Sequence, residues 1–460
     1  MRRAGTGVAR HGGLVGVLVV GAIIRVAVAR MGVPSVYQDS LIYLRLAKNA
    51  PFGFSALRPN GYPLLIRVLS VGTGNLRWIT DLQHVAGLAL GVLVYLLLVR
   101  LGTRRWLAAV AVAVVVIDAY GVALETDVLS EIFFTVSVTA SVVLVAATRR
   151  GTPALVASGL LLALAVVTRA VGIFAVPVWL AYVGLLGLGW RRALVAVAAV
   201  VVPVLGYCTF HSVHGGSFGF TDGDGWFLYA KVGPIIDCSH AHVPPATLSL
   251  CHGPTVSDPD FYLFSRASPA QQLFFGPVGD VDVDTAITPA SDRLLRDFSL
   301  GVIRAHPLAY MRLVSSDVVH YLGPKKAPVE LSLYGSHGSL EDRYGRYVHV
   351  PWWLVPAATA VALGALVTRQ AHRLEIGLLV GMAWALLVGS SATAGFNPRY
   401  TIPLVPLLVC AAALGAEVLV AGTTHWTTSR PHARRGEGSA TADVDEHEPG
   451  VGVDGPSQAL

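Results

Sequence analysis

Ten runs of apolar residues, most of them divided by short polar or arginine-containing segments, dominate this chain of 460 residues. Charged residues make up only 13% of the chain, whereas an ordinary soluble domain has about 25%. Because a membrane span needs roughly 20 mostly apolar residues, the pattern predicts an all-α polytopic membrane protein with about ten transmembrane helices. A soluble enzyme is excluded. The ten runs are 12–31, 81–100, 105–118, 129–148, 153–168, 171–189, 192–210, 351–368, 373–391 and 400–421.

The arginines are divided unequally between the loops on the two sides of these runs. The short loops of one side hold nine arginines, whereas those of the other side hold only Arg169 and Arg399. Cytoplasmic loops carry an excess of basic residues, so we expect a multi-pass plasma-membrane protein with both termini in the cytoplasm. The segments 32–80 and 211–350 then face outward, so a site formed by them is extracytoplasmic. The nine arginines are Arg100, Arg104, Arg105, Arg149, Arg150, Arg191, Arg192, Arg369 and Arg373.

The topology divides the chain into four parts. Residues 211–290 are rich in Gly, Pro and Asp and predict a small irregular extracytoplasmic domain, and the polar tail is expected to be disordered. The net charge of +6 does not indicate a nucleic-acid partner, because the arginines lie between apolar runs and not on one basic face. The four parts are residues 1–210 (seven spans, with a first outer loop at 32–80), 211–350 (the extracytoplasmic domain), 351–425 (three spans) and 426–460 (the tail).

Two segments of the outer parts have the pattern of helices that lie in the membrane surface. In residues 40–49, Leu41, Leu44 and Ala47 share one helical face. In residues 307–322, apolar residues recur at steps of three and four, and a proline occupies the first turn.

The first candidate catalytic group is Asp39, which follows the first span and precedes the helix predicted at 40–49. A carboxylate at this boundary can accept a proton from an incoming hydroxyl group. Asp is also a good N-cap, so the sequence leaves catalysis and capping both open. Tyr43 and Arg58 belong to the same outer loop.

Three more acids, Glu125, Asp127 and Glu131, lie in a short segment between two spans. Such carboxylates can share a cation or bind the hydroxyl groups of a sugar. The alternative is a solvated loop, or acids favoured by the dipole at a helix N-terminus. Arg25 lies inside the first span, and its long side chain is expected to extend outward to the membrane surface.

Basic side chains at the outer ends of spans are candidates for binding a phosphate group. Arg169 and Arg399, the latter followed by Tyr400, can each form two parallel hydrogen bonds with phosphate oxygens. Lys325 and Lys326 follow the second interfacial helix and can add to the same site. The alternatives are arginines that anchor the spans at the membrane surface and lysines in a solvated loop.

The four cysteines include one pair in the predicted extracytoplasmic domain. Cys238 and Cys251 lie where oxidation is permitted, so a disulfide between them is predicted, with two free thiols as the alternative.

Taken in order, these motifs resemble the GT-C superfamily of membrane glycosyltransferases that use polyprenyl-phosphate sugars. The resemblance is greatest to the protein O-mannosyltransferase and aminoarabinose transferase group. That group often has two adjacent acids in its first loop, whereas here Gln38 precedes Asp39, which weakens the case for a metal in this loop. The motifs are the outer loop from Tyr37 to Pro63, ETDVLSEIFF at 125–134, TRAVGIFAVP at 168–177, RAHPLAYMRLVSSDVVHY at 304–321 and NPRYTIPLVPLL at 397–408.

The resemblance implies a reaction and a role for each candidate. A sugar would move from a polyprenyl-phosphate donor to a hydroxyl group of an acceptor protein, lipid or glycan, next to membrane lipid. Asp39 would be the general base. Acceptor, sugar or an optional divalent cation would be held by Glu125, Asp127 and Glu131, and the donor phosphate by Arg169, Arg399, Lys325 and Lys326.

Two other functions fit parts of the sequence. A transporter or lipid flippase would explain the spans, but it would more often place its ionisable groups near the membrane midplane. A non-catalytic scaffold for cell-envelope assembly would use residues 211–350 for docking, and it would keep working when the acids near the outer surface were substituted.

Overall fold

The computed structural model describes residues 11–31, 34–49, 53, 55–70, 75–147, 151–276, 287–322, 353–368, 372–395 and 397–428. Secondary structure in these residues is helical apart from one isolated β-bridge between Ser35 and Asp127, so the predicted all-α class is confirmed. Lys325, Lys326 and the tail beyond residue 428 lie outside the described residues.

Each of the ten apolar runs folds as helix. Five helical segments are long and apolar enough to cross a membrane, which makes this a multi-pass membrane protein, while the other five have 10–17 residues. The expected count of ten spans is therefore not confirmed by helix length. The helices are α2 (Gly12–Met31), α5 (Arg77–Arg100), α6 (Arg105–Ile117), α8 (Glu131–Ala147), α9 (Thr152–Thr168), η1 with α10 (Ala170–Phe174 and Ala175–Leu185), α11 (Trp190–Val213), α19 (Leu354–Val367), α20 (Arg373–Thr393), and η4 with α21 (Pro398–Thr401 and Leu404–Thr428).

Small side chains and hydrogen bonds between helices hold this bundle together. At the contact of α9 with α11, a Cβ on Gly159 would lie 2.9 Å from that of Ala199, so only glycine allows this approach. The hydroxyl of Ser158 on α9 lies 3.0 Å from that of Ser141 on α8 and accepts a hydrogen bond from the indole of Trp179. These polar contacts satisfy groups that lipid could not.

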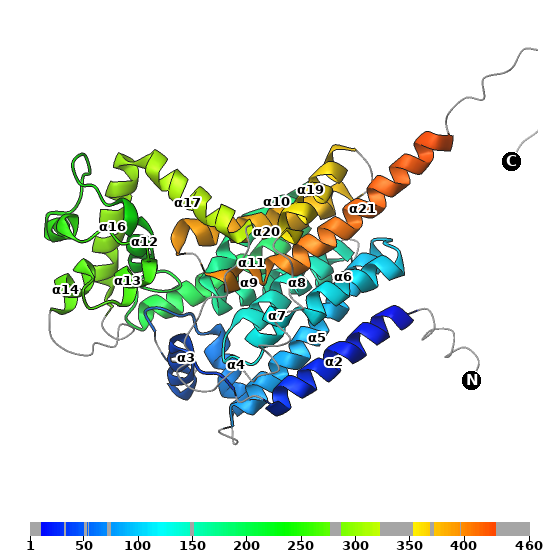
Figure 1. The fold of residues 1–460 in the computed structure, drawn as a ribbon, viewed down its shortest axis with the longest axis horizontal. Helices are drawn as coiled ribbons and strands as arrows, with labels where there is room; N and C mark the ends of the chain where they lie inside the picture. The colour runs from blue at the N-terminus through cyan, green and yellow to red at the C-terminus, as the bar shows by residue number, and fades with distance from the viewer. Residues whose placement is uncertain are drawn as a thin grey trace, which may run out of the picture.

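The outer segments are more helical than expected. Within 211–290, the described residues form several short helices, and the aromatic side chains of Trp226, Tyr229 and Tyr262 pack in one core with Phe298 of α16 (Pro289–Ala305) and Leu46 of α3 (Gln38–Asn49). Figure 1 shows these helices together beyond one end of the long apolar helices. The outer helices are α3 (Gln38–Asn49), α4 (Gly61–Ser70), α7 (Ala119–Leu124), α12 (Asp224–Val232), η2 (Gly233–Ile235), η3 (Pro245–His252), α13 (Pro259–Phe264), α14 (Pro269–Phe275), α16 (Pro289–Ala305) and α17 (Pro307–Leu322).

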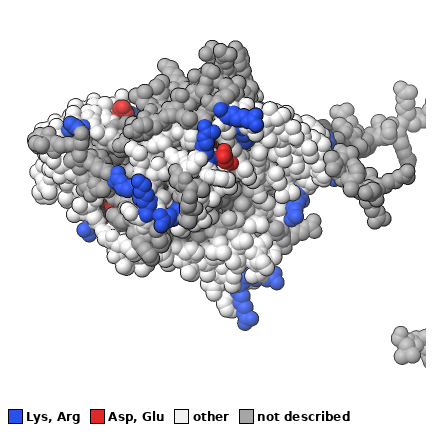
Figure 2. Space-filling model, turned by 90° about the horizontal axis from the view of Figure 1, so that it is seen from below, with Lys and Arg blue, Asp and Glu red and all other residues white. Residues whose placement is uncertain are grey.

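Two sequence-based predictions about this outer part are confirmed. Cys238 and Cys251 form a disulfide. The helix predicted at 307–322 is α17, and it exposes Leu308 and Met311. Figure 2 shows a surface that is mostly uncharged, with lysines and arginines in small separate groups.

A buried ion pair joins the first span to the loop before α8. Arg25 donates to both carboxylate oxygens of Glu125, at 2.8 and 2.6 Å, and His84 lies 2.8 Å from one of them. The expectation that Arg25 extends to the membrane surface is therefore wrong, because a partner inside the protein compensates its charge. Gly87 makes room for this pair, since a Cβ there would lie 1.9 Å from the Glu125 carboxylate.

We expect Glu125→Gln to lower the free energy of unfolding by about 3–5 kcal/mol, because the charge of Arg25 would stay buried without its counter-charge. Unfolding in detergent, followed by circular dichroism, measures this loss. The matched control is Glu417→Gln, which removes the partner of the exposed Arg104 and should cost at most about 1 kcal/mol. Equal losses in both variants would show that the Arg25–Glu125 pair is not structural.

Candidate active site

A cavity of about 310 Å³ lies between the apolar bundle and the outer helices. Its walls come from segments far apart in the chain: α3, the turn before α4, the α9–η1 junction, α12, α16, the end of α20 and η4. Apolar side chains such as Ile173 and Phe174 line one part of it. The charged residues that line it are Asp39, Arg58, Arg169, Asp224, Arg296 and Arg399.

Asp39 is held between two arginines. Its Oδ1 accepts a hydrogen bond from Nη2 of Arg58 at 2.5 Å, and its Oδ2 accepts one from Nη2 of Arg399 at 2.9 Å. Burial raises the pKa of Asp39, but the charges of the two guanidinium groups outweigh burial and hold that pKa well below its usual range. Asp39 lies inside the first turn of α3, which begins at Gln38, so its carboxylate binds arginines and does not precede the helix as an N-cap.

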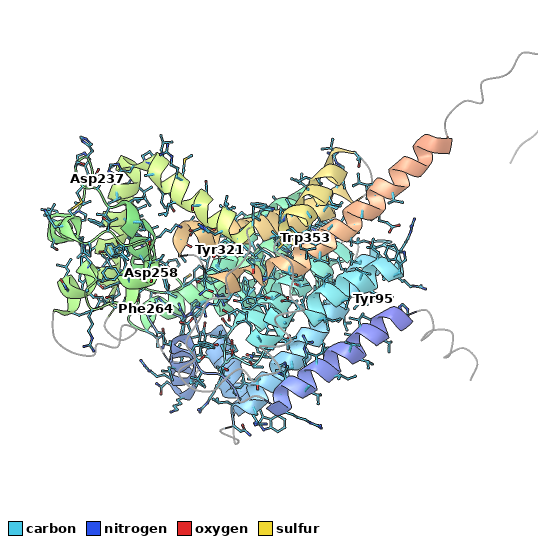
Figure 3. All side chains as sticks on the ribbon, in the orientation of Figure 1. Tyr95, Asp237, Asp258, Phe264, Tyr321 and Trp353 are labelled. Carbon is cyan, nitrogen blue, oxygen red and sulfur yellow. A yellow bond between two sulfur atoms is a disulfide. The ribbon has the colours of Figure 1, made fainter. Side chains whose placement is uncertain are left out.

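Local hydrogen bonds set the positions of these two arginines. The hydroxyl of Ser55 accepts the N–H of Arg58 and shapes the turn before α4. The side chain of Asn397 accepts the N–H of Arg399, and the N–H of Asn397 donates to the hydroxyl of Tyr321 at 3.0 Å. Tyr321 is buried near the end of α17, as Figure 3 shows, so this outer helix helps to fix Arg399.

Glu131 and Arg169 form a second ion pair beside the first. Glu131 is the first residue of α8, and Arg169 follows α9. Nε of Arg399 lies 3.5 Å from Oε1 of Glu131, so the two pairs form one network. The guanidinium of Arg169 also lies over the ring of Tyr400, at 5.4 Å from its centre.

The hydroxyl of Tyr43 continues this network on α3. It lies 3.2 Å from that of Ser130, toward which Arg169 donates at 3.5 Å. Seven of the residues singled out in the sequence therefore come together at the cavity and at a small pocket beside it, which Glu131 lines: Asp39, Tyr43, Arg58, Glu131, Arg169, Arg399 and Tyr400.

The network carries more positive than negative charge. Three guanidinium groups accompany two carboxylates, which leaves an excess of one positive charge. Nε of Arg58 is buried and donates no hydrogen bond to any described residue. An excess positive charge beside an unused donor suits an anion such as phosphate. The charged groups are Arg58, Arg169 and Arg399, with Asp39 and Glu131.

The other two acids of the 125–131 segment do not line this cavity. Glu125 is bound to Arg25 and His84, as described above. Asp127 is buried; its backbone forms the bridge with Ser35, and its carbonyl accepts a hydrogen bond from Gln83.

The donor set does not fit a divalent cation. Asp39 uses both of its oxygens on arginines, and Glu131 faces Arg169 and Arg399. In the part of the chain that the structure describes, no group of three His, Cys, Asp or Glu side chains could hold a metal ion.

Sequence reasoning missed the residues that the outer helices contribute, above all Asp224 and Arg296. The available signals were weak: an acidic turn, TDGDG, at 221–225, and an amphipathic segment at 289–305.

Asp292, near the start of α16, fixes the beginning of α12. Its Oδ1 accepts the N–H of Gly225 at 2.6 Å and that of Trp226 at 3.3 Å. Burial raises the pKa of Asp292 to about 7, and the charge of Asp224 adds to this. The carboxyl of Asp292, on α16, therefore links its own protonation state to the position of α12, the helix that carries Asp224.

No protein-family profile and no curated protein sequence matches the chain. Among solved structures it is similar to the protein O-mannosyltransferase Pmt1–Pmt2 complex of S. cerevisiae bound to its sugar donor (16% identity, TM-score 0.36, 48% of this chain and 36% of that chain). It is also similar to the oligosaccharyltransferase AglB of Archaeoglobus fulgidus in complex with an inhibitory peptide and dolichol-phosphate (14%, TM-score 0.43, 93% and 52%).

A third similar structure is ArnT from Cupriavidus metallidurans bound to undecaprenyl phosphate (15% identity, TM-score 0.35, 90% of this chain and 79% of that chain). All three are GT-C glycosyltransferases, the superfamily that the motifs resemble. The chain spans about a third and about half of the lengths of the yeast and archaeal proteins. Likeness at these TM-scores does not assign an activity. The function is therefore argued from the side chains of the cavity.

We expect Asp292→Asn to flatten the pH dependence of stability between pH 4 and 7. The folded-state pKa of Asp292, about 7, lies above its ordinary value of 3.8. The protonated form therefore favours folding, and the wild type loses stability as pH rises through this window, by about 4 kcal/mol at most. Asn keeps the acceptor oxygen but does not titrate.

Thermal unfolding in detergent at pH 5 and pH 8 measures this effect. The control is Asp297→Asn, an exposed position on the same helix, which should keep the wild-type pH dependence. If Asp292→Asn keeps it too, burial of Asp292 does not govern the stability of this part.

Proposed function

We propose that this protein is a membrane glycosyltransferase that moves a sugar from a polyprenyl-phosphate donor to an acceptor hydroxyl group at the outer face of the membrane. The observation that carries the proposal is the position of Asp39, between two arginines of a cavity with excess positive charge. The cavity is charged on one part of its wall and apolar on another, as a lipid-linked phosphate requires.

The donor phosphate would bind at Arg58, Arg169 and Arg399. A phosphodiester carries one negative charge, which matches the excess of one positive charge in the network. When the bond to the sugar breaks, further negative charge develops on the phosphate, and guanidinium groups already in place stabilise it. The apolar lining at Ile173 and Phe174 would contact the first isoprene units.

The proposed reaction is a displacement at the anomeric carbon of the sugar. The acceptor oxygen forms a bond to this carbon while the bond to the phosphate oxygen breaks, and its electron pair stays on the polyprenyl phosphate. The transition state resembles an oxocarbenium ion, as in glycoside hydrolysis. The proton of the acceptor hydroxyl passes to Asp39, the proposed general base.

Donor binding would also prepare Asp39 for this role. A carboxylate between two arginines accepts a proton poorly, because their charges lower its pKa. Once the phosphate shares these arginines, its negative charge offsets theirs and the pKa of Asp39 rises. The base would therefore become effective only in the presence of the donor.

The outward orientation of the site is part of the proposal and is supported by the arginine asymmetry of the loops. Transfer in proteoliposomes loaded with radiolabelled decaprenyl-phosphate mannose or arabinose tests the whole proposal. Release of decaprenyl phosphate together with a labelled acceptor is expected. Movement of the intact lipid across the bilayer without release would instead make the protein a transporter.

We expect Arg399→Ala to weaken the binding of decaprenyl phosphate by about 10- to 100-fold, because a hydrogen-bonded charge pair is lost. Arg399→Lys should restore only part of the affinity, since an ammonium group cannot form two parallel hydrogen bonds. Native mass spectrometry of the purified protein measures binding without an acceptor. Arg105→Ala, an exposed arginine at the start of α6, is the matched control. Equal affinities in all variants would make Arg399 only a structural anchor.

We expect Asp39→Asn to lower the rate of transfer by about 10²- to 10⁴-fold, because the acceptor proton loses its base. Binding of decaprenyl phosphate should be unchanged or tighter, since the substitution removes a negative charge beside Arg58 and Arg399. Asp237→Asn, in an exposed outer loop (Figure 3), is the control. A variant at position 39 that transfers at the wild-type rate would show that Asp39 only holds the arginines.

A further inference from the structure

The outer helices contribute a second pair of charged side chains to the cavity. Asp224 is the first residue of α12 and Arg296 lies on α16, and both are exposed where they line the cavity. Phe227, one turn further along α12, lies beneath the guanidinium of Arg58 at 5.6 Å. The wall formed by Asp224, Arg296 and Phe227, here called the outer wall, therefore adjoins the arginines proposed to bind the donor.

Asp224 differs from Asp39 in what occupies its oxygens. Its Oδ1 accepts a hydrogen bond from the hydroxyl of Thr221 at 3.0 Å, and among the described residues no arginine or lysine pairs with it within salt-bridge distance. Although the side chain is exposed to the cavity, the protein around it raises the pKa of Asp224, with Thr221 and Arg296 opposing this. Asp224 thus keeps acceptor positions open for a ligand.

The outer wall is also held rigidly. Asp292 fixes the N–H groups of Gly225 and Trp226, directly after Asp224. A Cβ on Gly225 would lie 2.0 Å from the backbone oxygen of Asp292, so α12 and α16 touch at this point. Asp224 and Arg296 therefore keep a fixed relation to each other, as two groups that bind one ligand must.

We infer that the outer wall binds a carbohydrate acceptor through neighbouring hydroxyl groups. A carboxylate accepts hydrogen bonds from hydroxyls, and a guanidinium group next to it donates to them. The exposed surface of Phe227 offers an apolar face beside these polar groups, the combination typical of small-ligand sites. This inference rests on the proposed function and adds the class of acceptor to it.

The position of the outer wall assigns it to the acceptor and not to the donor. Asp224 and Arg296 belong to helices that lie beyond the apolar bundle (Figure 1), whereas Arg169 and Arg399 lie at the ends of apolar helices. A lipid-linked donor enters from the bundle, and a water-soluble glycan enters from the outer helices. Asp224 orients the acceptor, and Asp39 still takes the proton.

The test compares Asp224→Asn and Asp224→Ala with the wild type, using short mannose and arabinose oligosaccharides as acceptors. Loss of hydrogen bonds to a charged group should raise the acceptor KM about 10-fold in the first variant and up to about 100-fold in the second. The donor KM and the slow hydrolysis of the donor without acceptor should change by less than about 2-fold. Asp237→Asn, at an exposed position that does not line the cavity, is the matched control.

Saturation-transfer NMR with the same oligosaccharides measures acceptor binding separately from the reaction. Binding that Asp224→Ala abolishes would support the outer wall even if the wild type releases no decaprenyl phosphate, in which case the proposed function alone fails. Three results would overturn the inference: an unchanged acceptor KM in both variants, a raised donor KM, or an effect confined to serine- and threonine-containing peptides as acceptors.

Discussion

The hydrogen bonds from Arg58 and Arg399 to one carboxylate join the first outer loop to the segment before the last apolar helix. Asp39 and Arg399 are 360 residues apart, at the start and the end of the bundle. Without a negative charge between them, Arg58, Arg169 and Arg399 would repel one another in a poorly solvated cavity. The carboxylate of Asp39 therefore links the first outer loop to the last apolar helix. The same contact holds together the two arginines that an anionic ligand would bind.

A second buried charge pair supports this arrangement from behind. Arg25 and Glu125 fix the loop before α8, and Gln83 donates to the backbone oxygens of Glu125 and Asp127. Because this loop is held on both sides, α8 begins with Glu131 facing Arg169. Charged groups buried in an apolar bundle are costly unless they are paired, and here each pair either lines the cavity or holds a segment that does.

The sequence predicts the apolar helices and most of the charged residues of the site. Apolar runs of helical length and the arginines at their ends predict where Asp39, Arg169 and Arg399 lie, because all three follow or precede such a run. It could not show that Glu125 turns away, since its partner Arg25 is 100 residues distant. The sequence did not predict a role for Asp224, because this residue begins a helix of nine residues in a Gly-rich segment. A helix of this length is too short for its apolar period to be recognised.

The charge balance of the cavity also bears on how a reaction would end. Under the proposed function, the donor is a phosphodiester with one negative charge, whereas the product, a phosphate monoester, carries about −1.5 to −2 near neutral pH. The arginines that stabilise the transition state would therefore hold the product more tightly than the donor. Asp39 can promote release of the product, because its carboxylate competes with the phosphate for Arg58 and Arg399. Loss of its acquired proton would restore that competition, so deprotonation of Asp39 and departure of the polyprenyl phosphate become one coupled step.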